Sequence, residues 1–306
     1  MRPARLAAAL LVVAASLAGC ATTPKAAADG APIPVVAAEN FWGSLAQQLG
    51  GSHVKVTSII SNPDADPHDY EATAGDAKAI ARARLAIVNG VGYDTWAGKL
   101  ADANPAPDRT VLNVGDLVGV KEGDNPHRWY NPDNVRKVLD QITADYRAID
   151  PADAAFFDNQ HETVLKTNLK AYFDAIDQIK ASYAGTPIGA SESIVAMIAP
   201  ALGVNLITPG TFLTAISEGT DPTAADKATI DAQIKNRQIK VYVYNPQNAT
   251  PDIQAQVDAA KAAFIPVATM TETLTPAGAS FQDWQVSQLT TLKELLASAR
   301  PTPSGK

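Results

Sequence analysis

PADAAFFDNQHETVLKTNLKAYFDAIDQIKASY, residues 151–183, is the stretch that decides the fold. Large side chains recur along it in steps of three or four, which predicts one continuous helix with a single apolar stripe. The stripe comprises Phe157, His161, Leu165, Leu169, Tyr172, Ile176, Ile179 and Tyr183. At roughly 1.5 Å per residue this helix would be about 50 Å long, more than one small domain needs. We therefore expect a spine that joins two lobes.

The segments on both sides of this helix alternate between short apolar runs and helical patterns. Before it, the apolar runs are residues 34–38, 54–60, 85–88 and 110–113; after it, they are residues 188–190, 204–207, 240–244 and 267–269. Alternation of this kind indicates parallel sheets covered by helices. The predicted fold class is α/β, with two lobes, each a mostly parallel sheet flanked by helices, joined by one long rigid spine helix.

This pattern divides the chain into six segments. We predict a signal peptide at 1–19, a tether at 20–33, an N-terminal α/β lobe at 34–149, the spine at 150–184, a C-terminal α/β lobe at 185–300 and a tail at 301–306. Four pairs of a capping residue and a proline predict helix starts, because proline lacks the N–H that a first turn leaves unbonded. They are Asn131-Pro132, Asp150-Pro151, Asp221-Pro222 and Thr250-Pro251.

Composition excludes several classes of protein. The chain has 306 residues, a net charge of −7 and one cysteine. An acidic balance argues against non-specific binding of nucleic acid, which requires a basic face. A single cysteine excludes an intramolecular disulfide framework and a zinc site built from several thiolates.

The first residues are typical of an export signal. Arg2 and Arg5 precede an apolar run over residues 6–18 that is too short for a comfortable membrane span. The run ends in Leu17-Ala18-Gly19-Cys20, which resembles the bacterial lipobox, although a chance cysteine near a signal is the alternative. We expect lipidation of Cys20 and a working domain held outside the cytoplasmic membrane.

Four polar residues stand at or near the predicted carboxyl ends of strands or helix starts: His68, His127, Glu192 and Glu272. Taken singly, such a residue is more often a solvated turn residue. Ligands of open α/β sheets bind beyond the carboxyl ends of the strands. Two imidazoles and two carboxylates, two from each lobe, can bind one divalent transition metal.

The segments around these residues resemble the zinc/manganese-type metal-binding lipoproteins, the substrate-binding proteins of bacterial ABC importers. The matching segments are Asp66-Pro67-His68-Asp69-Tyr70-Glu71, Asn125-Pro126-His127, Ser191-Glu192 and Glu272-Thr273-Leu274. Two departures stand out. Glu272 replaces the family's usual aspartate, and residues 118–125 lack the histidines that many zinc-type members have there.

The resemblance implies capture of a divalent metal in the cleft between the lobes and its delivery to a cognate ABC permease by a monomer without catalytic activity. Carboxylate ligands slightly favour Mn²⁺ over Zn²⁺, although raw affinity favours Zn²⁺. A metal-dependent hydrolase is the main alternative, but it would need an open coordination position and a general base. A surface adhesin is the other alternative.

Two further histidines are expected to lie outside the site. His53 follows a glycine-rich turn and should be exposed, and His161 lies on the apolar stripe and should be a packing residue.

Overall fold

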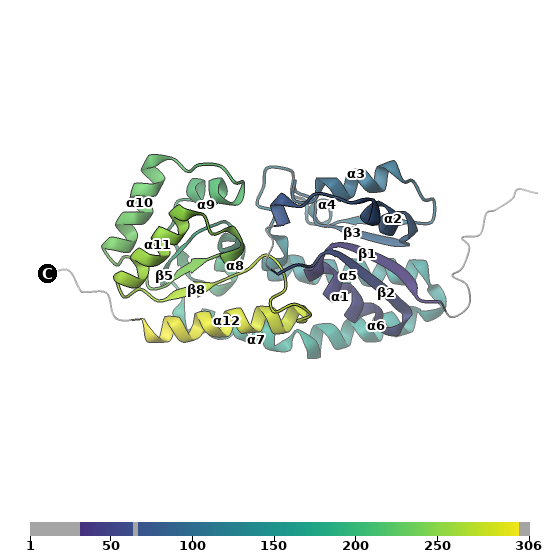
Figure 1. Ribbon diagram of the computed structural model, residues 1–306. Coiled ribbons are helices and arrows are strands. Elements are labelled where there is room, and N and C mark those ends of the chain that lie inside the picture. Colours follow the sequence, from purple (N-terminus) through teal and green to yellow (C-terminus); the bar gives the residue numbers. More distant parts are fainter. Residues whose placement is uncertain (1–30, 64–66, 300–306) are drawn as a thin grey trace, which may run out of the picture.

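The computed structural model describes residues 31–63 and 67–299, which form two four-stranded parallel sheets (Figure 1). The first sheet has the order β2-β1-β3-β4, with β1 (Ile33–Glu39), β2 (Val54–Ile60), β3 (Leu85–Val88) and β4 (Thr110–Asn113). The second has the order β6-β5-β7-β8, with β5 (Pro187–Ala190), β6 (Asn205–Leu206), β7 (Tyr242–Tyr244) and β8 (Val267–Thr269). Every pairing is parallel, so the predicted α/β class with two lobes is confirmed.

The central strands explain the apolar runs in the sequence. All four residues of β3 are buried, and so are six of the seven residues of β1. A strand covered by helices on both faces is apolar along its length, whereas the edge strand β2 alternates in exposure. The carboxyl ends of the central strands therefore lie between layers of helices.

Helices cover both faces of each sheet (Figure 1). The N-terminal lobe contains α1 (Asn40–Gly50), α2 (Ala74–Arg82), α3 (Thr95–Ala103), α4 (Val114–Val118) and α5 (Pro132–Ile149). The C-terminal lobe contains α8 (Ile194–Leu202), α9 (Gly210–Ser217), α10 (Ala224–Lys235), α11 (Pro251–Ala262) and α12 (Phe281–Ser298). A small separate core lies under α2 and α3, whereas the main core continues from α1 and α5 into the second lobe.

The connecting helical stretch lies beneath both lobes in Figure 1, but it is not one continuous α-helix. It consists of a 3₁₀ turn (Pro151–Asp153), α6 (Ala154–Thr163), a π-helical turn (Val164–Asn168) and α7 (Lys170–Tyr183). The N–H of Leu169 donates to the carbonyl of Val164, five residues back, at 2.9 Å. Three successive steps of four residues, from Phe157 to Leu169, exceed the 3.6 residues of an α-turn, and a wider turn keeps both Phe157 and Leu169 buried.

The proline-based helix starts were predicted with mixed success. Asn131 caps α5 and Thr250 caps α11, each with proline in the first turn, as expected. The start at Asp221-Pro222 is wrong, because α10 begins at Ala224 and Thr223 caps it by accepting from the N–H of Asp226 at 3.1 Å. The pair Asp150-Pro151 opens the 3₁₀ turn rather than an α-helix. Helix α9 was not predicted.

The predicted signal peptide 1–19, Cys20, nearly all of the tether and the tail 301–306 lie outside the described residues. Within residues 31–63 and 67–299, no helix combines the length and apolar character that crossing a membrane requires.

Candidate metal centre

The four predicted ligands follow strands or precede helices at the facing edges of the two lobes. His68 lies in a 3₁₀ turn (Pro67–Asp69) after β2, and His127 directly precedes a 3₁₀ turn (Arg128–Tyr130) that leads into α5. Glu192 lies between β5 and α8, and Glu272 follows β8. Two candidates therefore come from each lobe.

Three of the four side chains meet directly. The Nε2 atom of His68 lies 3.5 Å from Oε2 of Glu272, and Nε2 of His127 lies 3.9 Å from the same oxygen. Ligand atoms of these three residues all fall within 4.8 Å of one another. Glu192 joins the group through the amide of Asn245, which donates to one oxygen of Glu192 and one of Glu272.

His127 is fully buried and is held in one tautomer. The Oδ1 atom of Asn125 accepts the backbone N–H of His127 at 3.0 Å, and Nδ1 of the imidazole lies 2.9 Å from the same oxygen. Nδ1 therefore bears the hydrogen, which leaves Nε2 with its lone pair. Burial, helped by the nearby His68, lowers the pKa of His127 well below its ordinary value, so the ring stays neutral. Its Nε2 atom is buried without a hydrogen-bond partner among the described residues.

Glu272 is also held in place by hydrogen bonds. Its backbone N–H donates to Oε1 of Gln247 at 2.6 Å, and its Oε2 accepts the hydroxyl of Tyr93 at 2.7 Å. Both Glu272 and Glu192 are at most 2% exposed. Burying two neighbouring carboxylates costs considerable free energy unless a cation compensates their charge. The donor set, two imidazoles and two carboxylates in a buried cluster, therefore fits a divalent transition metal.

Three further residues of the site, Asn125, Tyr93 and Asn245, were not predicted from the sequence. Asn245 directly follows β7, whereas Glu272 stands a few residues beyond β8, so a search for polar residues at strand ends would have found Asn245. Asn125 stands two residues before His127 in a segment that the sequence analysis quoted only for its histidine.

The other two histidines lie outside this cluster. His53 is not the exposed turn residue that we expected, because its Nδ1 lies 2.7 Å from Oδ2 of Asp153 and its ring lies 4.0 Å from that of Phe156. Nε2 of His161 lies 2.7 Å from Oδ1 of Asp140. His161 is therefore a satisfied, partly buried residue on the helical stretch.

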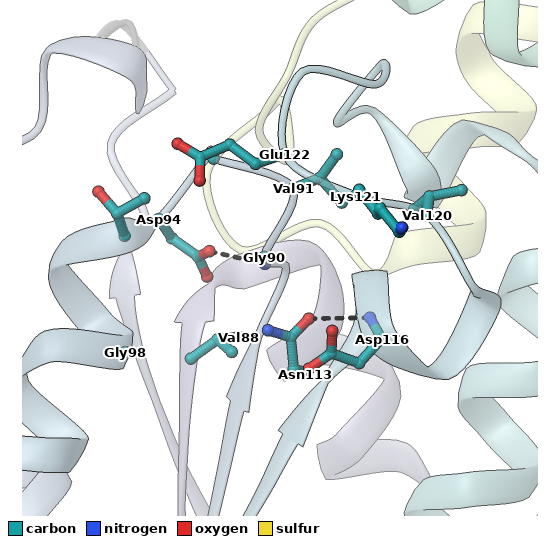
Figure 2. Close-up of a pocket in the computed structure, with 12 residues that line it drawn as sticks. Val88, Gly90, Val91, Asp94, Gly98, Asn113, Asp116, Val120, Lys121 and Glu122 are labelled. Atoms are coloured by element: carbon teal, nitrogen blue, oxygen red, sulfur yellow. Dashed lines mark hydrogen bonds between the residues drawn. The ribbon is translucent and has the colours of Figure 1, made fainter.

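Two hollows flank the loops that bear these residues. A cavity of about 340 Å³ lies beyond β3 and β4, lined by residues that include Asp94, Asn113 and Glu122 (Figure 2). None of the four predicted ligands lines it. A cavity of about 50 Å³ lies beside His68, between the loop 123–126 and residues that include Ser193 and Glu218 of the other lobe. This smaller hollow adjoins the cluster.

Replacing Asn125 by alanine should lower metal affinity by roughly ten- to a hundredfold, since it removes the acceptor that fixes the hydrogen on Nδ1 of His127 and leaves only the Ser193 hydroxyl, at 3.1 Å, which can donate as well as accept. Isothermal titration calorimetry with Mn²⁺ and Zn²⁺ measures the change. Asn104→Ala serves as the control, because its amide donates to the Leu100 carbonyl at the end of α3, away from the site. Equal affinities for the two variants would contradict this positioning role.

Two parallel α/β lobes with polar side chains converging between them define a bilobal binding protein for a small ligand. The model of the family "ZnuA: Zinc-uptake complex component A periplasmic" matches residues 35–295. The chain therefore belongs to this family.

Two curated relatives agree with this assignment. The chain is 28% identical over 163 residues to the manganese-binding lipoprotein MntA of Halalkalibacterium halodurans, covering 51% of this chain and 53% of the relative. It is 28% identical over 176 residues to the manganese ABC transporter substrate-binding lipoprotein PsaA of Streptococcus mitis, covering 53% and 54%. These matches thus span about half the length of the curated relatives.

A solved periplasmic metal binding protein from Candidatus Liberibacter asiaticus superposes with a TM-score of 0.71 at 18% identity, covering 87% of this chain and 100% of that one. At this identity the likeness supports the fold.

Proposed function

We propose that this protein captures a divalent transition metal ion, manganese or zinc, in the cleft between its lobes and delivers it to an ABC permease. His68, His127, Glu192 and Glu272 are the proposed ligands. Two carboxylates balance the double charge of the ion, which lowers the cost of burying it. The protein performs no chemistry on its cargo.

The observation that carries this proposal is the state of His127. Its buried Nε2 has no hydrogen-bond partner among the described residues and lies 3.9 Å from Oε2 of a buried carboxylate. A neutral imidazole is the form that binds metal, so this ring is ready to bind at neutral pH without losing a proton.

The finer features of the proposal follow from the family and the sequence. A lipid on Cys20 anchors the chain, residues 20–33 tether it, and residues 34–149 and 185–300 form the two lobes about the segment 150–184. The chain works as a monomer outside the cytoplasmic membrane. The family description refers to zinc and the names of both relatives to manganese, so both ions belong in the test. The comparisons do not favour a hydrolase.

The test is a metal titration of the full mature chain after treatment with a chelator. We expect one equivalent of Mn²⁺ or Zn²⁺ to bind, with release of few protons near pH 7 and a rise in the unfolding temperature. If neither ion bound, the proposal would be wrong. Hydrolysis of an ester or phosphoester by the loaded protein would instead favour the enzyme alternative.

A further inference from the structure

Asn245 occupies a fixed position between the two buried carboxylates. It follows β7, is 1% exposed, and donates its backbone N–H to Oγ of Ser191 at 3.1 Å. Its Oδ1 accepts the backbone N–H of Gln247 at 2.9 Å. Because the carbonyl oxygen is used in this turn, the NH₂ group has to face the site, where only acceptors can satisfy it.

The NH₂ group of Asn245 binds one oxygen of each carboxylate. Nδ2 lies 3.1 Å from Oε1 of Glu192 and 3.0 Å from Oε1 of Glu272. The second oxygen of Glu272, Oε2, faces both histidines and accepts the Tyr93 hydroxyl. The two oxygens of Glu272 therefore have different surroundings: Oε1 accepts a hydrogen bond from Asn245, and Oε2 faces the histidines.

The hydrogen bonds of Asn245 affect the number of ligand atoms that the two carboxylates can offer. A hydrogen bond leaves a lone pair on the oxygen that accepts it, but it fixes the rotation of the carboxylate and turns that oxygen towards the amide. We therefore expect Glu192 and Glu272 each to bind an ion through the other oxygen. With two imidazoles, the site then offers four ligand atoms, which is the number that zinc prefers. If both Oε1 atoms were released, each carboxylate could chelate and the site would offer six, the number typical of manganese.

We propose that Asn245 is a positioning residue that sets the coordination number of the bound ion and thereby disfavours manganese relative to zinc. The inference rests on the metal-binding function proposed above. It modifies the slight preference for Mn²⁺ drawn from the ligand types alone, because ligand type and ligand count act in opposite directions at this site. Charge-assisted hydrogen bonds to carboxylates are strong enough to hold this arrangement.

The test compares the wild type with Asn245→Ala and uses Co²⁺, Mn²⁺ and Zn²⁺ as probes. Four-coordinate Co²⁺ absorbs visible light intensely, whereas six-coordinate Co²⁺ absorbs weakly. We expect an intense band for the wild type and a weak one for Asn245→Ala. The ratio of the dissociation constants for Mn²⁺ and Zn²⁺ should fall by about tenfold or more in the variant, which corresponds to about 1.4 kcal/mol.

Two further variants keep the test decisive. Asn248→Ala is the matched control, because Asn248 lies in the same turn but its amide donates to the carbonyl of Ile216, away from both carboxylates. Asn245→Ser keeps a small polar side chain whose hydroxyl can donate to only one oxygen at a time, so its shift should be smaller and in the same direction.

The outcomes separate the two proposals. If the wild type bound none of the three ions, the metal-binding function itself would fail. If the wild type bound them, but the Co²⁺ spectrum and the affinity ratio were the same in wild type and Asn245 variants, the role of Asn245 would be overturned. A proportional loss of affinity for both Mn²⁺ and Zn²⁺, with an unchanged spectrum, would likewise reduce Asn245 to a structural residue.

Discussion

Replacement of His127 by alanine should lower the affinity for Mn²⁺ and Zn²⁺ by roughly a hundredfold or more. Loss of a residue that merely orients a ligand already costs about ten- to a hundredfold, and His127 is a proposed ligand itself. The change also leaves Glu272 facing one imidazole instead of two. Isothermal titration calorimetry on the chelator-treated protein measures the effect.

His161→Ala is the control for this experiment. His161 also binds a carboxylate, at 2.7 Å from Asp140, but it lies on the connecting helical stretch rather than in the cluster. Its replacement should leave both affinities within about twofold of the wild type, since sites without shared contacts act independently. Undiminished binding by a folded His127→Ala protein would remove His127 from the ligand set.

The second large effect concerns a buried pair of carboxyl groups behind the site, Glu39 and Asp94. Glu39 ends β1 and is fully buried, and Asp94 is 1% exposed. Asp94 accepts the backbone N–H groups of Asn89 at 2.6 Å and Gly90 at 2.7 Å, and Figure 2 shows the second of these bonds. The two carboxyl groups lie close enough for the charge of Asp94 to act on Glu39, and both side-chain oxygens of Glu39 are buried without a hydrogen-bond partner among the described residues.

Glu39 is the group that holds the proton. Burial, followed by the charge of nearby Asp94, raises the pKa of Glu39 well above its ordinary value. Burial raises the pKa of Asp94 as well, but its backbone hydrogen bonds oppose that shift. The folded chain therefore keeps a proton that the unfolded chain loses above about pH 4.5. This contribution to stability is complete at lower pH and is lost as the pH rises towards the folded pKa of Glu39.

Glu39→Gln should remove this loss, because glutamine is neutral at every pH. Relative to the variant, the wild type should lose about 1.4 kcal/mol of unfolding free energy per pH unit above the unfolded pKa, until the folded pKa is reached. Urea denaturation from pH 5 to pH 8 measures the difference. Glu162→Gln, at an exposed surface position, should run parallel to the wild type over this range. Parallel curves for Glu39→Gln would mean that Glu39 is ionised in the folded protein.

Hydrophobic periodicity was sufficient to predict the strands and the two lobes, because a parallel strand that is covered by helices on both faces must be apolar along its length. It could not predict the π-helical turn at Val164–Asn168, since a stripe with steps of three and four fits an α-helix nearly as well. Helix α9 also escaped it: its eight residues follow Pro209 and begin with glycine, a combination more typical of a loop. The false start at Asp221-Pro222 arose because Thr223, two residues later, is an equally good cap.

The candidate ligands could be named from the sequence because the segments around them resemble those of a known family, whereas each residue taken singly would be interpreted as a solvated turn residue. The residues that orient them could not. Glu39 is the last residue of β1 and Asn245 directly follows β7, but their roles depend on which neighbours the fold places opposite them. A buried glutamate beside an aspartate retains its proton, and an asparagine between two carboxylates holds both in place by hydrogen bonds. Neither property is visible before the distances are known.

Because two proposed ligands lie on each lobe, a bound ion would hold the two lobes together. An ion bound by residues of both lobes ties them together, so the free energy of its binding adds to the work needed to part them. At a free ion concentration a thousand times the dissociation constant, this amounts to about 4 kcal/mol. A protein that binds its ion tightly enough to retain it at low ion concentration also releases the ion slowly. If the proposed delivery to a permease is correct, release of the ion requires contacts between the permease and the two lobes that offset this free energy.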